Sequence, residues 1–92
     1  MREKTIEYAL VRRVRQAGGL CEKWNAGTAG WPDRILLFPD GRVAFVEVKA
    51  PGEKPRPLQV HRHEQLRALG FQVYVLDSIE QIGGILNAIQ TT

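Results

Sequence analysis

The sequence predicts an α/β fold, a mixed sheet with flanking helices, whose elements follow the order α-β-β-β-α-β-α. Three segments repeat apolar residues every three or four positions, as helices do, and four short apolar runs have the length of strands. Glycine and proline interrupt the chain between those segments. A chain of 92 residues also suits one domain. We therefore expect residues 1–92 to form a single α/β domain.

The first two helices are predicted from their apolar faces and their ends. Residues 3–17 carry an apolar stripe at helical spacing, formed by Ile6, Leu10, Val14 and Ala17. Gly18-Gly19 then ends this helix, because glycine readily adopts the left-handed conformation found after a helix. A second helix is expected over residues 57–69. Its inward face is expected to consist of Leu58, Leu66 and Leu69.

Four strands and a last helix complete the prediction. The strands are expected at residues 20–25, 34–38, 42–49 and 71–76. The last of them is a continuous apolar run with one glutamine, which is typical of a strand covered on both faces. The final helix follows Ser78-Ile79-Glu80-Gln81, which has the pattern of a capping box. Gly83-Gly84 weakens this helix and leaves room for another backbone to pack closely against it.

The turn between the second and third strands decides which residues face each other. Phe38-Pro39-Asp40-Gly41 reads as a type I turn, because proline suits its second position and the following glycine tolerates a left-handed conformation. A three-residue loop that starts at the proline places Asp33 opposite Glu47. The alternative is a two-residue turn at Asp40-Gly41, which places Asp33 opposite Val48 and sends the two acids to opposite sides. The proline favours the first register.

Asp33 and Glu47, when directly opposed, hold their Cβ atoms about 4.5–5.5 Å apart, and like charges so placed destabilise a sheet. A bound divalent cation relieves that repulsion, and carboxylate oxygens suit Mg²⁺ or Mn²⁺. Such an ion can hold a phosphate oxygen and lower the pKa of a bound water. Lys49 falls on the same strand face as Glu47, where it could steady the phosphate or orient the attacking water. Either motif alone is more often structural, but together they predict a metal-dependent site that cleaves phosphodiester bonds.

The charge of the chain favours an anionic partner such as nucleic acid. Its formal net charge is +3 and its sequence pI about 9.4. Lys54 and Arg56 flank the loop after the third strand, where we expect them to contact phosphate. Arg12 on the first helix either contacts DNA or belongs to a solvated helix end. Trp31 either stacks on a base or closes the core.

Cysteine and histidine usage excludes other kinds of site. Cys21 is the only cysteine and is expected as a small strand residue, so no internal disulfide can form and a reducing compartment fits. His61 and His63 give no zinc spacing with Cys21. They are two residues apart, do not share a helical face, and are expected at the surface.

No apolar run approaches the roughly 18 residues that a bilayer span needs. We expect a cytoplasmic protein of a bacterial or phage-infected cell.

The whole pattern resembles the PD-(D/E)xK nuclease superfamily and, more specifically, the VRR-NUC family of virus-type replication and repair nucleases. The resemblance runs over essentially the full chain. The residues that carry it, in chain order, are Glu7, Gly18-Gly19, Gly30-Trp31-Pro32-Asp33, Glu47-Val48-Lys49, Leu58-Gln59, Leu66 and Leu69-Gly70.

The resemblance implies a restriction-endonuclease-like core and a role for each residue of the central motif. Asp33 and Glu47 would be metal ligands, with the Val48 backbone carbonyl as a third. Lys49 would be the catalytic lysine. Mg²⁺, or Mn²⁺ in its place, would be the cofactor.

Two further catalytic candidates also rest on the resemblance. Glu7 would reach the metal region from the first helix and is a possible ligand. Glu3 and Glu7 could instead form a solvated helix face, because they lie four residues apart. Gln59 would support the site from the second helix.

Small stand-alone members of the family are homodimers that act on branched DNA, notably Holliday junctions. The resemblance therefore implies a Mg²⁺-dependent, structure-selective DNA endonuclease. Two alternatives stay open. One is another nuclease of the same superfamily with duplex, flap or exonucleolytic activity. The other is a non-catalytic DNA-binding module.

Overall fold

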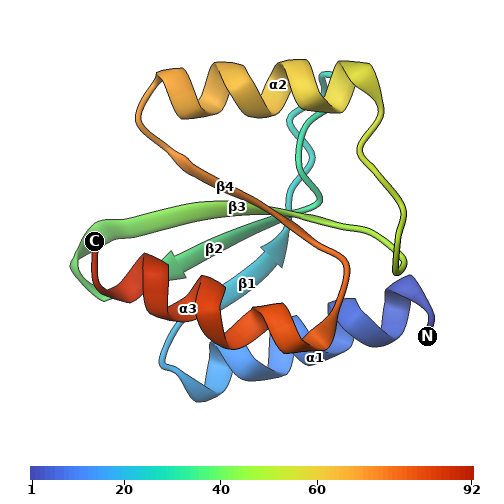
Figure 1. The fold of residues 1–92 in the computed structure, drawn as a ribbon. Helices are drawn as coiled ribbons and strands as arrows, with labels where there is room; N and C mark the ends of the chain where they lie inside the picture. Colours follow the sequence, from blue (N-terminus) through green and yellow to red (C-terminus); the bar gives the residue numbers. More distant parts are fainter.

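The computed structural model describes all 92 residues and has three layers, with a four-stranded sheet between helices (Figure 1). The strands lie in the order β1-β2-β3-β4, where β1, β2 and β3 are antiparallel neighbours and β4 is parallel to β3. Helix α2 covers one face, and α1 and α3 cover the other. The elements are α1 (Glu3–Gln16), β1 (Leu20–Lys23), β2 (Arg34–Phe38), β3 (Arg42–Val48), α2 (Pro57–Ala68), β4 (Gln72–Leu76) and α3 (Ile82–Gln90). This arrangement confirms the predicted α/β class and order.

The main hydrophobic core lies between the sheet and helices α1 and α3. Helix α1 contributes Ile6, Leu10 and Val14 of its predicted stripe, and strands β2 and β3 contribute even-numbered positions such as Leu36 and Val46. A smaller cluster on the α2 side consists of Phe45, Leu66 and Val73. Because side chains alternate along a strand, the odd-numbered positions of β3 face α2. Glu47, two residues after Phe45, therefore faces α2.

Cys21 lies in β1 as predicted and is 1% exposed. Burial raises the pKa of its thiol to about 11. The reactive form of cysteine is the thiolate, so this residue is an inert part of the core.

The turn at Pro39–Gly41 sets the predicted register of β2 and β3. Arg34 pairs with Val46, so the three-residue connection is confirmed and the two-residue alternative is wrong. The prediction of a type I turn is wrong as well. Asp40, at the third turn position, has φ 66° and ψ 25°, and Gly41 follows with φ 68°. A left-handed third residue is the mark of type II, and aspartate tolerates that conformation better than most side chains do.

Helix α2 presents a different face to the sheet from the predicted one. Leu58 is 46% exposed and Leu69 is 76% exposed, so the prediction that both point inward is wrong. The buried residues of α2 are Gln59, His63 and Leu66. Successive residues of a helix are about 100° apart, so a shift from Leu58 to Gln59 turns polar side chains toward the sheet. Glu47 lies on that face and supplies their polar partner.

The predicted capping box before α3 does not form. Ser78 makes no side-chain capping hydrogen bond, residues Ile79–Gln81 form a 3-10 turn, and α3 begins only at Ile82. Gln81 Oε1 instead accepts a hydrogen bond from the Asp77 N–H at 2.9 Å.

None of the helices combines the length and apolar composition that a bilayer crossing requires.

Gly83 and Gly84 do not admit a neighbouring backbone, contrary to the prediction. A Cβ built at Gly83 meets Arg13 Nη2 at 3.5 Å, and nothing lies within 4 Å of a Cβ at Gly84. Space for a side chain is therefore available at Gly84. At Gly19, in contrast, a Cβ would lie 2.8 Å from the Leu37 backbone oxygen.

We expect Gly84→Ala to raise the free energy of unfolding by about 0.5–1 kcal/mol, because alanine is the better helix former. Gly19→Ala is the matched comparison, and its overpacking should cost about 1–3 kcal/mol. Urea unfolding followed by circular dichroism measures both. Equal stabilities of the two variants would contradict the packing described here.

Candidate active site

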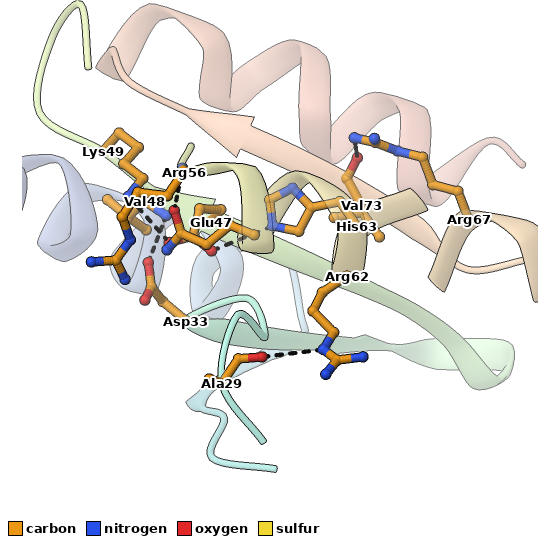
Figure 2. A network of polar contacts seen from close by, with 11 residues as sticks. Ala29, Asp33, Glu47, Val48, Lys49, Arg56, Arg62, His63, Arg67 and Val73 are labelled. Atoms are coloured by element: carbon orange, nitrogen blue, oxygen red, sulfur yellow. Dashed lines mark hydrogen bonds and ion pairs between the residues drawn. The ribbon is translucent and has the colours of Figure 1, made fainter. Parts of the chain in front are cut away.

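Asp33 and Glu47 lie opposite each other at one end of the sheet. Asp33 directly precedes β2, and Glu47 is the penultimate residue of β3. Because Arg34 pairs with Val46, the next pair outward is Asp33 with Glu47. Asp33 Oδ2 accepts a hydrogen bond of 2.8 Å from the Val48 N–H, which ties the two strand ends together (Figure 2). The hairpin thus brings the two acids together as the register predicts.

Glu47 is only 1% exposed, and both of its carboxylate oxygens have partners (Figure 2). Oε1 lies 3.4 Å from His63 Nε2. Oε2 accepts a hydrogen bond of 3.2 Å from Gln59 Nε2 and lies 3.8 Å from Lys49 Nζ. Lys49 reaches Glu47 along the strand, as alternation predicts, whereas Gln59 and His63 reach it from α2. A buried carboxylate requires such partners, because burying a charge without them is costly.

The start of α2 fixes the orientation of the Gln59 side chain. Its Oε1 accepts a hydrogen bond of 2.8 Å from the Arg56 N–H, at the N-terminus of the helix. Because a backbone N–H can only donate, the amide oxygen must face Arg56 and the amide NH₂ must face Glu47. Gln59 therefore contacts both the helix end and the carboxylate, and its supporting role in the site stays a prediction.

The surroundings of Glu47 favour its neutral form. Burial is the largest cause that raises its pKa to about 8, and the negative charge of the neighbouring Asp33 carboxylate adds to it. The ammonium of Lys49 lowers the pKa of Glu47, and Glu3 raises it. The metal-free pair of acids consequently retains a proton near neutral pH, where a divalent cation could supply the missing positive charge.

The donor set fits a hard divalent cation. Carboxylate oxygens are preferred ligands of Mg²⁺ and Mn²⁺, and two acids at one strand end provide them. No group of three or more His, Cys, Asp or Glu side chains lies close enough to hold an ion. Main-chain oxygens and water would therefore complete the coordination, which is usual for Mg²⁺. The Val48 carbonyl stays a predicted third ligand.

Glu7 lies on the other face of the sheet from this group. Its Oε2 accepts a hydrogen bond of 2.9 Å from Arg34 Nε, and no hydrogen bond joins it to Asp33 or Glu47. The reason is alternation: Arg34 follows Asp33, so its side chain points toward α1 and meets Glu7 there. The charge of α1 that affects the pKa of Glu47 belongs to Glu3, one turn earlier. A metal-binding role for Glu7 would require the ion pair with Arg34 to open.

The prediction that His63 is a surface residue is wrong. His63 is 2% exposed, whereas His61 is exposed as predicted. Burial lowers the pKa of His63, the charges of Arg67 and Lys49 lower it further, and Asp33 acts in the opposite direction. The sequence contained one sign of this position, because His63 follows Gln59 by four residues and so shares its helical face.

The candidate DNA-binding residues surround the site in different ways. Lys54 and Arg56 are exposed in the segment that leads into α2. Arg12 is exposed on α1, on the other side of the sheet. Trp31 packs on Phe45, with ring centroids 6.0 Å apart, so it does close the smaller core cluster. It also lines an open hollow of about 430 Å³ beside α2, where stacking on a base stays a prediction.

Comparison with known proteins gives three agreeing results. The sequence model of the VRR-NUC domain matches residues 3–80. The chain is 49% identical over 90 residues to "Putative nuclease p44" of Acyrthosiphon pisum secondary endosymbiont phage 1. The aligned region covers 97% of this chain and 96% of that protein. A solved structure described as a VRR-NUC domain superposes with a TM-score of 0.86 at 33% identity, covering 92% of this chain and 94% of its own.

We expect the metal-free protein to lose stability as the pH rises from 4.5, the ordinary pKa of a glutamate side chain, to about 8. Folded Glu47 binds its proton more tightly than the unfolded chain does, so its contribution is complete below the lower value and disappears through the upper one. Thermal unfolding in EDTA across this range should show a smaller decline in Glu47→Gln, which cannot titrate. Glu64→Gln, an exposed change on α2, is the control. Identical pH profiles of wild type and Glu47→Gln would contradict the burial argument.

Proposed function

This chain belongs to the VRR-NUC family of nuclease domains, and from that membership we propose that it is a Mg²⁺-dependent, structure-selective DNA endonuclease. Its substrates would be branched DNAs, Holliday junctions among them. The observation that carries the proposal is the meeting of Asp33 and Glu47 at one strand end, with Lys49 beside them. Two facing acids destabilise a sheet. Catalysis by the two acids and the ammonium accounts for that cost in stability, whereas a non-catalytic DNA-binding role does not.

Each side chain of the site would have a separate role. Asp33 and Glu47 would hold the cation. When bound, the ion would supply a positive charge for a phosphate oxygen and lower the pKa of a water. Lys49 Nζ, 3.8 Å from Glu47 Oε2, would place a cationic donor next to the reacting phosphate or its attacking water. Gln59 would keep Glu47 in place from α2.

The distribution of charge supports a nucleic acid as the partner. An open hollow of about 390 Å³ lies between α1 and the start of β2, lined by Lys4, Glu7, Tyr8, Val11, Arg15, Lys23 and Arg34. Of the chain's 13 basic and 10 acidic side chains, four basic and one acidic line this hollow, so the rest carry nine of each. The lining of this hollow thus carries a formal charge of +3, which suits a phosphate backbone.

The proposal includes a homodimer. Paired incisions across a junction need two sites related by a two-fold axis, and one small chain offers one site. Molecular mass from size-exclusion chromatography, with and without junction DNA, tests this part. A phage protein among the relatives supports a place of action in the cytoplasm of an infected bacterial cell.

The experiment that tests the activity is a digestion panel. Four-way junction, flap, linear duplex and single-stranded DNA are incubated with the protein in Mg²⁺, in Mn²⁺ and in EDTA. We expect cleavage of the junction with either cation and none in EDTA. Preference for duplex, flap or strand ends would identify another nuclease activity of the superfamily, and the absence of cleavage on every substrate would contradict the proposal.

Asp33→Ala, Glu47→Ala and Lys49→Ala should each reduce junction cleavage by about 10²–10³-fold or more. The first two remove a carboxylate that would hold the cation, and the third removes the ammonium next to the reacting phosphate or its attacking water. Binding of the same junction should change little. Cleavage rates and fluorescence anisotropy in EDTA give the two quantities. Full nicking activity of Glu47→Ala would show that the site lies elsewhere.

Arg56→Ala should weaken DNA binding irrespective of sequence and reduce the slope of log Kd against log salt by about 0.9, the value for one phosphate contact. The Arg56 backbone N–H, and with it the contact to Gln59, is retained in this variant. Arg42→Ala is the control, since Arg42 begins β3 at the far end from Glu47 and pairs with Asp40. Equal slopes for the two variants would remove Arg56 from the DNA-binding surface.

A further inference from the structure

His63 is the partner of one particular oxygen of Glu47. The contacts of Gln59 and Lys49 are made to Oε2, whereas His63 Nε2 lies 3.4 Å from Oε1 (Figure 2). Both side chains of the pair have only 2% of their surface exposed. His63 therefore touches the carboxylate from the interior of the protein, on the side away from solvent.

We propose that His63 is a positioning residue that holds Glu47 in the orientation in which it binds a divalent cation. The inference rests on the proposed function. Contacts at a single oxygen leave a carboxylate free to swing about that oxygen, but contacts at both oxygens fix the plane of the group. Gln59 and His63 are four residues apart on α2, so one helical face holds both ends of the carboxylate.

The burial of an imidazole at this position supports the assignment. His63 lies between Gln59 and Leu66 on the buried face of α2, where an apolar side chain would pack without polar cost. A buried ring nitrogen needs a polar partner, and Glu47 is the partner that the structure gives it. Arg67, four residues after His63, donates a 2.7 Å hydrogen bond to the Val73 carbonyl and so does not compete for Glu47.

Two substitutions separate positioning from packing. His63→Leu fills the space but removes the polar contact, whereas His63→Gln keeps an amide nitrogen close to the place of Nε2. Loss of a group that orients a metal ligand typically weakens metal affinity by about 10–100-fold. We expect that loss of Mn²⁺ affinity in His63→Leu, measured by calorimetry on the folded protein, and recovery of most of it in His63→Gln.

The control is His61→Leu, a change of the same kind on the exposed side of the same helix, which should bind Mn²⁺ as wild type does. Thermal unfolding in EDTA reports any loss of packing separately. If His63→Leu does not fold, His63→Met gives the same comparison, because its flexible apolar chain fills irregular space. Wild-type Mn²⁺ affinity in a folded His63→Leu or His63→Met protein would overturn the proposal, whatever the change in melting temperature.

Cleavage kinetics give a second readout. His63→Leu should raise the Mg²⁺ concentration needed for half-maximal cleavage and leave the KM for DNA unchanged, since His63 does not reach the surface. If the wild type binds Mn²⁺ with the expected dependence on His63 but cleaves no DNA, the proposed function fails and the role of His63 stands. If the wild type cleaves DNA and the two proteins show the same Mg²⁺ dependence, the role of His63 fails and the proposed function stands.

Discussion

The backbone hydrogen bonds between β2 and β3 decide which side chains can form a site. A shift of the register by one residue would move every side chain of one strand to the other face and separate Asp33 from Glu47. The register is set at the opposite end of the hairpin, where Asp40 and Gly41 both have positive φ. At the site itself, the Val48 N–H donates a hydrogen bond to the Asp33 carboxylate. The outermost hydrogen bond between the two strand ends is therefore accepted by a candidate catalytic side chain.

The facing acids require polar partners from α2. Two acids that face each other need compensation, and the strand supplies only Lys49 on the same face. Helix α2 therefore turns Gln59 and His63 inward, while Leu58 and Leu69 remain largely exposed. The smaller cluster under α2 has only three buried apolar residues, against fifteen on the other face. Most of the apolar packing therefore lies between the sheet and helices α1 and α3, whereas the α2 side also holds the buried polar contacts of Glu47.

How much the sequence predicts depends on how local each feature is. The hairpin and its facing acids follow from turn residues and alternation, which act over a few positions, and the order of elements along the chain follows from apolar periodicity and the glycine and proline between the segments. The face that α2 presents depends on a rotation about the helix axis, which Glu47 decides across more than ten intervening residues. The sequence alone therefore predicts Leu58 and Leu69 in the interior and His63 at the surface, and the structure shows the opposite. The partner of Glu7 cannot be read from local sequence for the same reason, because Arg34 reaches it from another element.

The ion pair of Glu7 and Arg34 shows how the two faces of the sheet are coupled. Arg34 follows Asp33 directly, and its guanidinium bonds to Glu7 and, at 3.5 Å, to the Cys21 carbonyl. With side chains only 13% and 22% exposed, Arg34 and Glu7 are desolvated enough for removal of one charge to leave the other poorly compensated. The pair anchors the beginning of β2 to α1 and β1, and Asp33 is the residue just before that anchor. Glu7 thus affects the position of Asp33 through the backbone, without any contact between the two carboxylates.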